Sequence, residues 1–165
     1  MRWRPPQEKS SPYITATGLQ RLKAELEGLW PARREVVAAL SAAAAEGDRS
    51  ENAEYIYRKK QLREMDRRIR YLQKRLDEVK PISGSPADRS RVFFGAWVKA
   101  EDEDGLTTDY QIVGADEIGE KPEAISVDSP VARALLGRSV GDEVSVAVPD
   151  GERCLSIIAV SYRDD

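Results

Sequence analysis

The sequence predicts an α+β protein: an N-terminal antiparallel coiled-coil helical hairpin followed by a small C-terminal domain made mainly of β-strands. Three observations predict this fold. Between residues 19 and 79, apolar residues recur at alternating steps of three and four, which is typical of helices packed along a seam. A glycine and several N-cap residues interrupt this repeat midway. Beyond residue 80, short Val- and Ile-rich segments alternate with Asp-Gly and Gly-Asp turns.

The two arms of the hairpin are predicted to face each other position by position. The residue numbers of facing seam positions add to 98, so that Leu22 faces Leu76 and the chain folds back at residue 49. Each arm has roughly 30 residues and spans about 45 Å at the helical rise. The seam comprises Leu19, Leu22, Leu26, Leu29, Arg33, Val36, Leu40 and Ala43 on the first arm and Tyr55, Arg58, Leu62, Met65, Ile69, Leu72, Leu76 and Val79 on the second.

Pro31 is the residue of the first arm that opposes a continuous helix. Proline removes a backbone donor and its ring crowds the preceding turn. We therefore expect a bend or a brief interruption near residues 28–31.

The turn between the arms contains an acidic pair, Asp48 and Glu51. An Asp at the N-cap with a Glu three residues later is a variant of the capping box, which explains the pair structurally. Carboxylates are also the hard oxygen ligands that Mg²⁺ prefers, although two are too few for a tight site. At the end of a rod they can instead complete a metal site that a partner supplies. The two interpretations are compatible, and both remain open.

Basic residues of the second arm form a stripe on the side away from the seam. The stripe consists of Lys60, Arg63, Arg67, Arg70 and Lys74, which extend over about 21 Å of helix. A plain coiled coil would balance them through i,i+4 pairs, and three are present: Glu54 with Arg58, Glu64 with Arg68 and Asp66 with Arg70. The remaining excess of cations indicates contact with nucleic acid or an acidic protein.

The charge is divided unevenly along the chain. Residues 1–80 contain 18 Lys and Arg against 12 Asp and Glu, whereas residues 81–165 contain 8 against 17. The halves therefore carry +6 and −9, which sum to the overall −3. Such a division favours a polyanionic partner for the N-terminal half.

Composition narrows the function classes further. Histidine is absent, which disfavours self-contained acid–base catalysis and the commonest transition-metal site. The single cysteine, Cys154, cannot form an intramolecular disulfide and fits a reducing compartment. No apolar run approaches the roughly 20 residues of a membrane span. Residues 1–12 are expected to be a flexible tail without a signal peptide. We expect a cytoplasmic protein.

The C-terminal domain is predicted to follow a turn-rich linker at residues 81–90. Strands of an antiparallel sheet are expected at residues 92–100, 106–113, 124–127, 143–148 and 154–160. One short helix interrupts them, with Ser129 as its N-cap, Pro130 at its first position and Gly137 beyond its end. Helix capping alone therefore explains the sequence Asp128-Ser129-Pro130.

The segments EGDRSENAEY at residues 46–55 and KKQLREMDRRIRYL at residues 59–72 resemble the Gre transcript-cleavage factors of bacteria. The basic second arm is similar to the GreB branch of that family. Further matches occur at residues 13–15, 18–19, 92–98 and 125–136, so that the resemblance covers almost the whole chain.

The resemblance implies a coiled-coil hairpin domain at residues 13–80 with an acidic tip at residues 46–54, and an FKBP-like domain at residues 91–165. In the family, the C-terminal domain docks on bacterial RNA polymerase and the hairpin enters its secondary channel. The polymerase then cleaves the 3′ end of backtracked RNA. An FKBP-like shape would not by itself imply prolyl isomerase activity.

Individual residues acquire expected roles from this resemblance. Asp48 and Glu51 would help the polymerase hold Mg²⁺, which the isolated chain would not bind tightly, while Ser50 and Asn52 would support the tip. Nucleic acid or the channel wall would be contacted by Arg49, Arg58, Lys59, Lys60, Arg63, Arg67, Arg70 and Lys74. Asp128, Ser129 and Pro130 would dock on the polymerase. The factor would act as a monomer and would be an accessory to the polymerase, not an enzyme.

Two other functions stay open at this point. The hairpin can block the channel as an inhibitor without stimulating cleavage, although the intact Asp48 and Glu51 disfavour this. The basic stripe can also contact a nucleic-acid duplex directly. A dimeric basic zipper would need parallel helices, however, and the constant sum of facing positions favours an intramolecular hairpin.

Overall fold

A computed structural model describes residues 9–46, 52–82 and 86–163 of the chain. The described residues belong to two compact units: a hairpin at residues 19–79, and a second unit that combines the described parts of residues 1–18 and 80–165. The predicted α+β class is confirmed. The boundary differs from the prediction, because residues 13–18 belong with the C-terminal unit and not with the hairpin.

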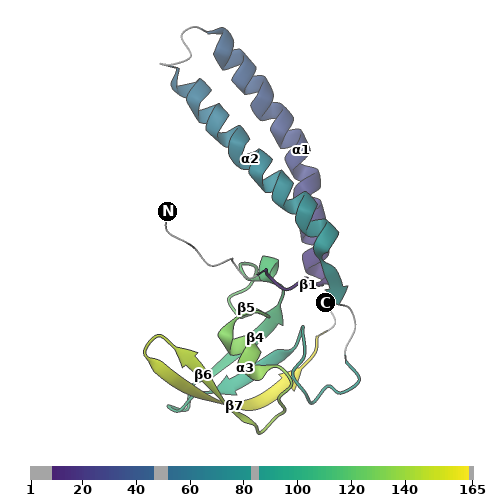
Figure 1. Cartoon of the computed structure of the whole chain (residues 1–165), viewed down its shortest axis with the longest axis vertical. Coiled ribbons are helices and arrows are strands. Elements are labelled where there is room, and N and C mark those ends of the chain that lie inside the picture. The colour runs from purple at the N-terminus through teal and green to yellow at the C-terminus, as the bar shows by residue number, and fades with distance from the viewer. Residues whose placement is uncertain (1–8, 47–51, 83–85, 164–165) are drawn as a thin grey trace. The chain divides into compact units, whose positions relative to one another are not determined.

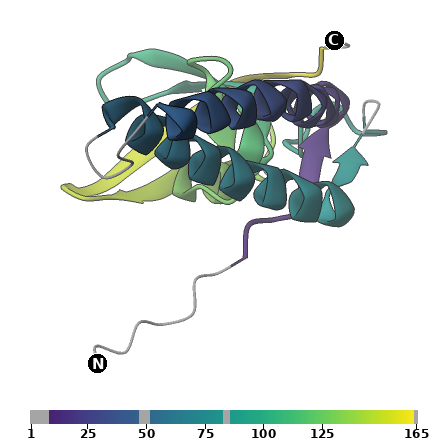
Figure 2. The same ribbon diagram turned by 90° about the horizontal axis from the view of Figure 1, so that it is seen from above.

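The hairpin consists of α1 (Ala16–Ala45) and α2 (Ala53–Glu78), which run side by side (Figures 1 and 2). Every predicted seam residue is buried or partly buried. Cross-arm bonds join Ala43 to Asn52 and Arg33 to Asp66, as the antiparallel pairing requires. The periodicity of the sequence was therefore sufficient to place this interface.

Helix α1 continues through Pro31 without a break, so of the bend or interruption expected there, the interruption is excluded. Pro31 is exposed on the helix surface, where its missing donor costs one backbone hydrogen bond. On the seam, Leu29 and Val36 are partly and fully buried on either side of it. Packing along the arm thus stabilises the helical conformation against the local preference of proline.

Arg33, which interrupts the apolar seam of the first arm, forms an ion pair across the hairpin. Its Nε lies 2.7 Å from Asp66 Oδ1. Arg58, which interrupts the seam of the second arm, instead lies 2.8 Å from Glu54 Oε1 on its own helix. Both exceptions in the pattern are therefore cations with a nearby acceptor, which reduces the cost of partly burying them.

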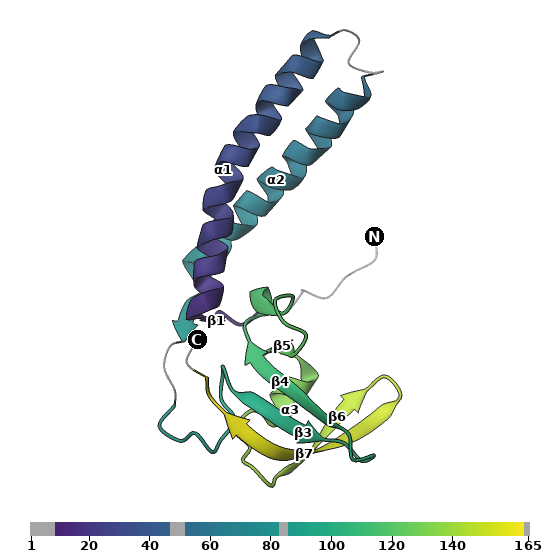
Figure 3. The same cartoon turned by 180° about the vertical axis from the view of Figure 1, so that it is seen from behind.

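The C-terminal unit contains a five-stranded sheet in the order β5-β4-β3-β7-β6 (Figure 3). The strands are β3 (Trp97–Glu101), β4 (Thr107–Val113), β5 (Ala124–Ser126), β6 (Glu143–Val148) and β7 (Gly151–Ser161). The expectation of a fully antiparallel sheet is wrong at one edge, because β5 pairs with β4 in parallel. The 3-10 helix η1 (Ala115–Glu117) lies in this connection and was not predicted.

The strand expected at residues 92–100 begins only at Trp97. Gly95 has a φ of 87°, which an extended strand does not allow. Helix α3 (Pro130–Leu135) has the predicted caps, with Ser129 at its N-cap and Gly137 in the left-handed region at φ 79°. The sheet and α3 enclose a core of Val92, Ala96, Val98, Ala100, Ile112, Val127, Ala132, Leu135, Val144, Val146, Leu155 and Ile157.

A second, two-stranded sheet holds the start of the chain in this unit. Strand β1 (Tyr13–Thr15) pairs in parallel with β2 (Lys80–Ile82), and Ile14 in the middle of β1 is fully buried. Residues 81–82 of the predicted linker are therefore part of a strand. Two residues of the predicted tail also have partners, since Pro12 accepts a bond from the Lys80 backbone N–H at 2.7 Å and Ser11 bonds to Asp128.

The carboxylate of Glu117 joins β1, the first turn of α1 and the β4–η1 connection. Only 6% of the residue is exposed. Its Oε2 accepts from the backbone N–H of Gly114 at 2.8 Å and of Thr15 at 3.1 Å, and its Oε1 accepts from the Thr15 hydroxyl. The Thr15 hydroxyl oxygen in turn accepts from the Gly18 N–H at 3.0 Å.

Two glycines are required by the packing around this carboxylate. A Cβ at Gly114 would lie 2.3 Å from the Tyr13 carbonyl oxygen, and one at Gly18 would lie 2.2 Å from Glu117 Oε1. Neither position has room for a methyl group without a shift of its neighbours.

We expect Glu117→Gln to lower the free energy of unfolding of the C-terminal unit by about 1–3 kcal/mol, because the Gly114 and Thr15 N–H groups bond more weakly to a neutral amide oxygen than to a charged carboxylate. Urea unfolding followed by tryptophan fluorescence measures this change. Asp109→Asn, which neutralises an exposed acid on β4, is the matched control. Equal stability of the two variants would contradict the structural role of Glu117.

Candidate functional site

The predicted tip residues Asp48, Arg49, Ser50 and Glu51 lie outside the described residues, whereas Asn52 lies inside them. Asn52 is the N-cap of α2, and its Oδ1 accepts from the Tyr55 N–H at 3.1 Å. The predicted capping box with Asp48 at the N-cap of α2 is therefore wrong. Since Asn52 performs this function, capping of α2 no longer accounts for Asp48.

The second bond of Asn52 crosses the hairpin. Its Nδ2 donates to the Ala43 carbonyl oxygen at 2.7 Å, so that one amide group satisfies a backbone donor of α2 and a backbone acceptor near the end of α1. The last turn of α1 and the N-cap of α2 are thereby tied together. Asn ranks among the best N-cap residues, which could have identified this cap from the sequence, but the bond to Ala43 depends on the pairing of the helices.

The predicted basic stripe is present on α2. Lys60, Arg63, Arg67, Arg70 and Lys74 are all exposed. Within the part of the chain that the structure describes, Lys60, Arg63, Arg67 and Lys74 form no ion pair. The stripe is therefore a row of solvated positive charges, which is the arrangement expected of a surface that meets phosphates.

Two further described cations assigned to this contact lie beside the stripe, whereas Arg49 is outside the described residues. Arg58 is half-buried and bound to Glu54, and its guanidinium lies 5.4 Å from the centre of the Tyr57 ring. Lys59 is exposed, with its Nζ 5.8 Å from the centre of the Tyr55 ring. Arg58 is thus engaged within its own helix.

Acidic residues of the hairpin pair with cations outside the unpaired row. Glu25 accepts two bonds from Arg68, at 2.7 and 2.8 Å, across the arms, whereas the sequence predicted Glu64 as the partner of Arg68. The side-chain hydrogen bond from Arg33 lowers the pKa of Asp66, and the charges of Arg33 and Arg70 act in the same direction. The hydrogen bond from Arg68 likewise lowers the pKa of Glu25.

The segment Asp128-Ser129-Pro130 lies at the start of α3. Ser129 Oγ accepts from the Ala132 N–H at 3.2 Å, and Pro130 is exposed at the first helical position. The capping interpretation is confirmed. The carboxylate of Asp128 has another partner, because it accepts bonds from both the backbone N–H and the hydroxyl of Ser11. No sequence signal links these two residues.

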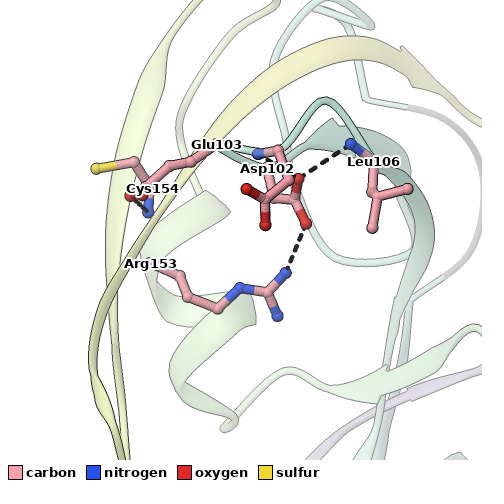
Figure 4. Close-up of polar contacts among 6 residues, drawn as sticks. Asp102, Glu103, Leu106, Arg153 and Cys154 are labelled. Carbon is pink, nitrogen blue, oxygen red and sulfur yellow. Dashed lines mark hydrogen bonds and ion pairs between the residues drawn. The ribbon is translucent and has the colours of Figure 1, made fainter.

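A pocket of about 210 Å³ lies between the β3–β4 turn and β7 (Figure 4). Asp102 in its wall accepts from the backbone N–H groups of Asp104 at 2.9 Å and Leu106 at 3.0 Å, and Arg153 lies 3.1 Å away. A side-chain hydrogen bond with Glu103 raises the pKa of the Cys154 thiol, which disfavours the reactive thiolate. The polar groups of this pocket therefore stabilise a turn.

Among the described residues, no group of three or more acidic, cysteine or histidine side chains is placed to hold a metal ion. None of the helices in the described part of the chain combines the length and the apolarity that a membrane span requires.

Two family models match the chain in succession. "Transcription elongation factor, N-terminal" matches residues 12–80, and "Transcription elongation factor, GreA/GreB, C-term" matches residues 87–162. The chain therefore belongs to the GreA/GreB family of transcription elongation factors, as the resemblance predicted.

Its relatives include proteins named GreB. The chain is 52% identical over 162 residues to transcription elongation factor GreB of Pseudomonas aeruginosa, which covers 98% of this chain and 96% of that protein. It is 55% identical over 163 residues to GreB of Xanthomonas axonopodis pv. citri, covering 98% and 97%. Similarity to the GreB branch is confirmed. Among solved structures, Gfh1 of Thermus thermophilus is 26% identical over 90% of this chain and 97% of that one, with a TM-score of 0.42.

We expect Asp66→Asn to destabilise the hairpin at pH 7 by no more than about 1 kcal/mol, since the side chains of Arg33 and Asp66 are 36% and 38% exposed. Because folding lowers the pKa of Asp66 below 3.8, the ion pair contributes above that pH and is lost as the pH falls through the folded pKa. The difference from the wild type should therefore shrink as the pH falls below 3.8.

Urea unfolding monitored by helical circular dichroism at several pH values measures this difference. Glu27→Gln, which neutralises an exposed acid on α1, is the control. A difference that grows on acidification would contradict the assignment.

Proposed function

We propose that this chain is an accessory factor of bacterial RNA polymerase that enters the secondary channel and stimulates cleavage of the 3′ end of backtracked RNA. Membership of the elongation-factor family supports a role in transcription elongation. The observation that carries the cleavage role is the bridge made by Asn52, the residue that follows Glu51 in the sequence, between the last part of α1 and the start of α2. Because Asn52 caps α2, the cap of this helix does not require Asp48.

The proposed roles at the tip follow from the donor set. Asp48 and Glu51 supply carboxylate oxygens, which suit a hard cation such as Mg²⁺ held jointly with the polymerase. When bound, that ion would contribute positive charge and Lewis acidity at the scissile phosphate. Ser50 and Asn52 support the two acids, and Asn52 does so by limiting how far the arms can separate. The isolated chain is not proposed to bind the ion tightly.

The basic stripe is proposed to lie along RNA or the wall of the channel. Its unpaired cations would bring the hairpin towards a negatively charged path and hold it there, as salt-dependent contacts. Arg49 and Lys59 would extend this positive surface near the tip. Asp128, Ser129 and Pro130 belong to the surface that we propose docks on the polymerase.

The chain is proposed to act as a monomer in the cytoplasm, where bacterial transcription takes place. The seam of each arm is covered by the other arm of the same chain, so the hairpin does not require a second copy to bury its apolar surface.

Replacing either tip acid should abolish most of the stimulation of cleavage. We expect Asp48→Ala and Glu51→Ala to lower the cleavage rate roughly 10- to 100-fold, because each removes a carboxylate that supports the ion. Gel-resolved cleavage of RNA in a stalled elongation complex measures this rate. Glu64→Ala, which removes an exposed acid from α2, is the control and should leave cleavage unchanged.

The same assay distinguishes the alternative function. Undiminished cleavage in both tip variants would exclude the metal role while leaving polymerase binding in place. A wild-type chain that slowed nucleotide addition without stimulating cleavage would instead be a channel-blocking inhibitor.

The role of Asn52 can be separated from simple helix capping. Ser caps a helix about as well as Asn, so we expect Asn52→Ser to retain the stability of α2, whereas Asn52→Ala loses about 1 kcal/mol. Neither variant can donate to Ala43 as the amide does. Both should lower the cleavage rate, on the order of 10- to 100-fold if the acids are displaced by about 1 Å. Wild-type cleavage by Asn52→Ser would contradict the bridge as the support of the tip.

A further inference from the structure

Both carboxylate oxygens of Asp128 are engaged by one residue near the start of the described chain. Ser11 donates its backbone N–H to Oδ2 at 2.8 Å and its hydroxyl to Oδ1. Asp128 and Ser11 are 117 residues apart in the sequence. We call this pair of bonds the Ser11–Asp128 clip.

Neighbouring bonds hold both sides of the clip in place. On one side, the Pro12 carbonyl accepts from the Lys80 N–H at 2.7 Å, directly before β1 joins β2. On the other, the Asp128 N–H donates to Ser126 Oγ at 3.1 Å and the Ser129 N–H donates to the Ser126 carbonyl at 2.9 Å. The clip therefore joins two segments that other hydrogen bonds already hold, and it attaches a residue that lies two positions before β1.

Residues 9 and 10, which precede the clip, are exposed, and so is Pro130, which follows it. Asp128 itself is only partly exposed, and each of its oxygens has one acceptor position occupied. A partner can therefore most readily reach residues 9 and 10, from the start of the described chain, and Pro130, at the start of α3.

We propose that Asp128 is a positioning residue, and that the surface by which the C-terminal unit meets RNA polymerase is a composite of residues 9–11 and residues 128–130 joined by the Ser11–Asp128 clip. This inference rests on the proposed function. It assigns the N-terminal segment a part in docking and gives Asp128 an indirect role.

Conservative substitutions at Asp128 distinguish an indirect role from a direct one. In Asp128→Asn, the amide oxygen can still accept from the Ser11 N–H, and the amide NH₂ can donate to the Ser11 hydroxyl, whose hydrogen is free to rotate. The clip then survives without its negative charge. In Asp128→Ala both bonds are lost.

Substitutions at Ser11 test the same clip from its other side. Ser11→Pro removes both donors, Ser11→Ala removes only the hydroxyl, and Ser11→Thr retains both. Asp109→Asn removes an exposed charge elsewhere in the same unit and is the control for net charge.

The affinity of each full-length variant for core RNA polymerase is measured by fluorescence anisotropy of a labelled chain. We expect Asp128→Ala and Ser11→Pro each to weaken binding about tenfold, and Asp128→Asn and Ser11→Thr to stay within about threefold of the wild type. The double variant Ser11→Pro with Asp128→Ala should be no weaker than either single variant, because both remove one interaction.

The inference would be overturned if Asp128→Asn weakened binding as much as Asp128→Ala while Ser11→Pro bound like the wild type. That result would show that the polymerase contacts the carboxylate directly. Absence of binding by the wild-type chain would overturn the proposed function as well. Amide hydrogen exchange tests the clip without polymerase: the Ser11 N–H should be protected in the wild type and lose protection in Asp128→Ala. Rapid exchange in the wild type would overturn the clip itself.

Discussion

The buried carboxylate of Glu117 is the interaction on which the C-terminal unit depends. A carboxylate can be buried at tolerable cost only if donors satisfy it, and here the donors come from Gly114 and Thr15, about a hundred residues apart along the chain. Those donors are available only when β1 lies beside the β4–η1 connection. Burial of one charge is therefore coupled to attachment of the start of the chain, and the tight packing at Gly18 and Gly114 follows from it.

The same principle recurs at Asp128, where a second acidic side chain holds the segment just before β1. Together, the two carboxylates attach residues 11–18 to a unit whose sheet lies at the other end of the sequence. This explains why the C-terminal unit contains both ends of the described chain. Cutting the chain between the helices and the sheet would therefore separate these two carboxylates from the hydrogen-bond donors of residues 11–18.

In the hairpin, charge placement and helix packing produce the candidate site together. Glu25 and Asp66 pair with Arg68 and Arg33 across the arms, so these acids do not neutralise the outward row of cations. At the end of the helices, one amide group of Asn52 caps α2 and holds the end of α1. The cap of α2 and the positively charged surface therefore belong to the same arm, which fits the proposed role in contact with RNA.

Much of this protein was determined by the sequence alone. The three-four period predicted the seam, and Ser129, Pro130 and Gly137 predicted α3, because both signals are local or repeat along a regular helix. Tertiary structure decided the rest. The continuity of α1 through Pro31, the parallel pairing of β5, the Asn52 bridge, the environment of Glu117 and the Ser11–Asp128 clip all arise from contacts between residues far apart in the chain. Such contacts leave no periodic pattern in the sequence. Those of Asn52, Glu117 and Asp128 each depend on a single side chain whose backbone partner comes close only when the chain folds.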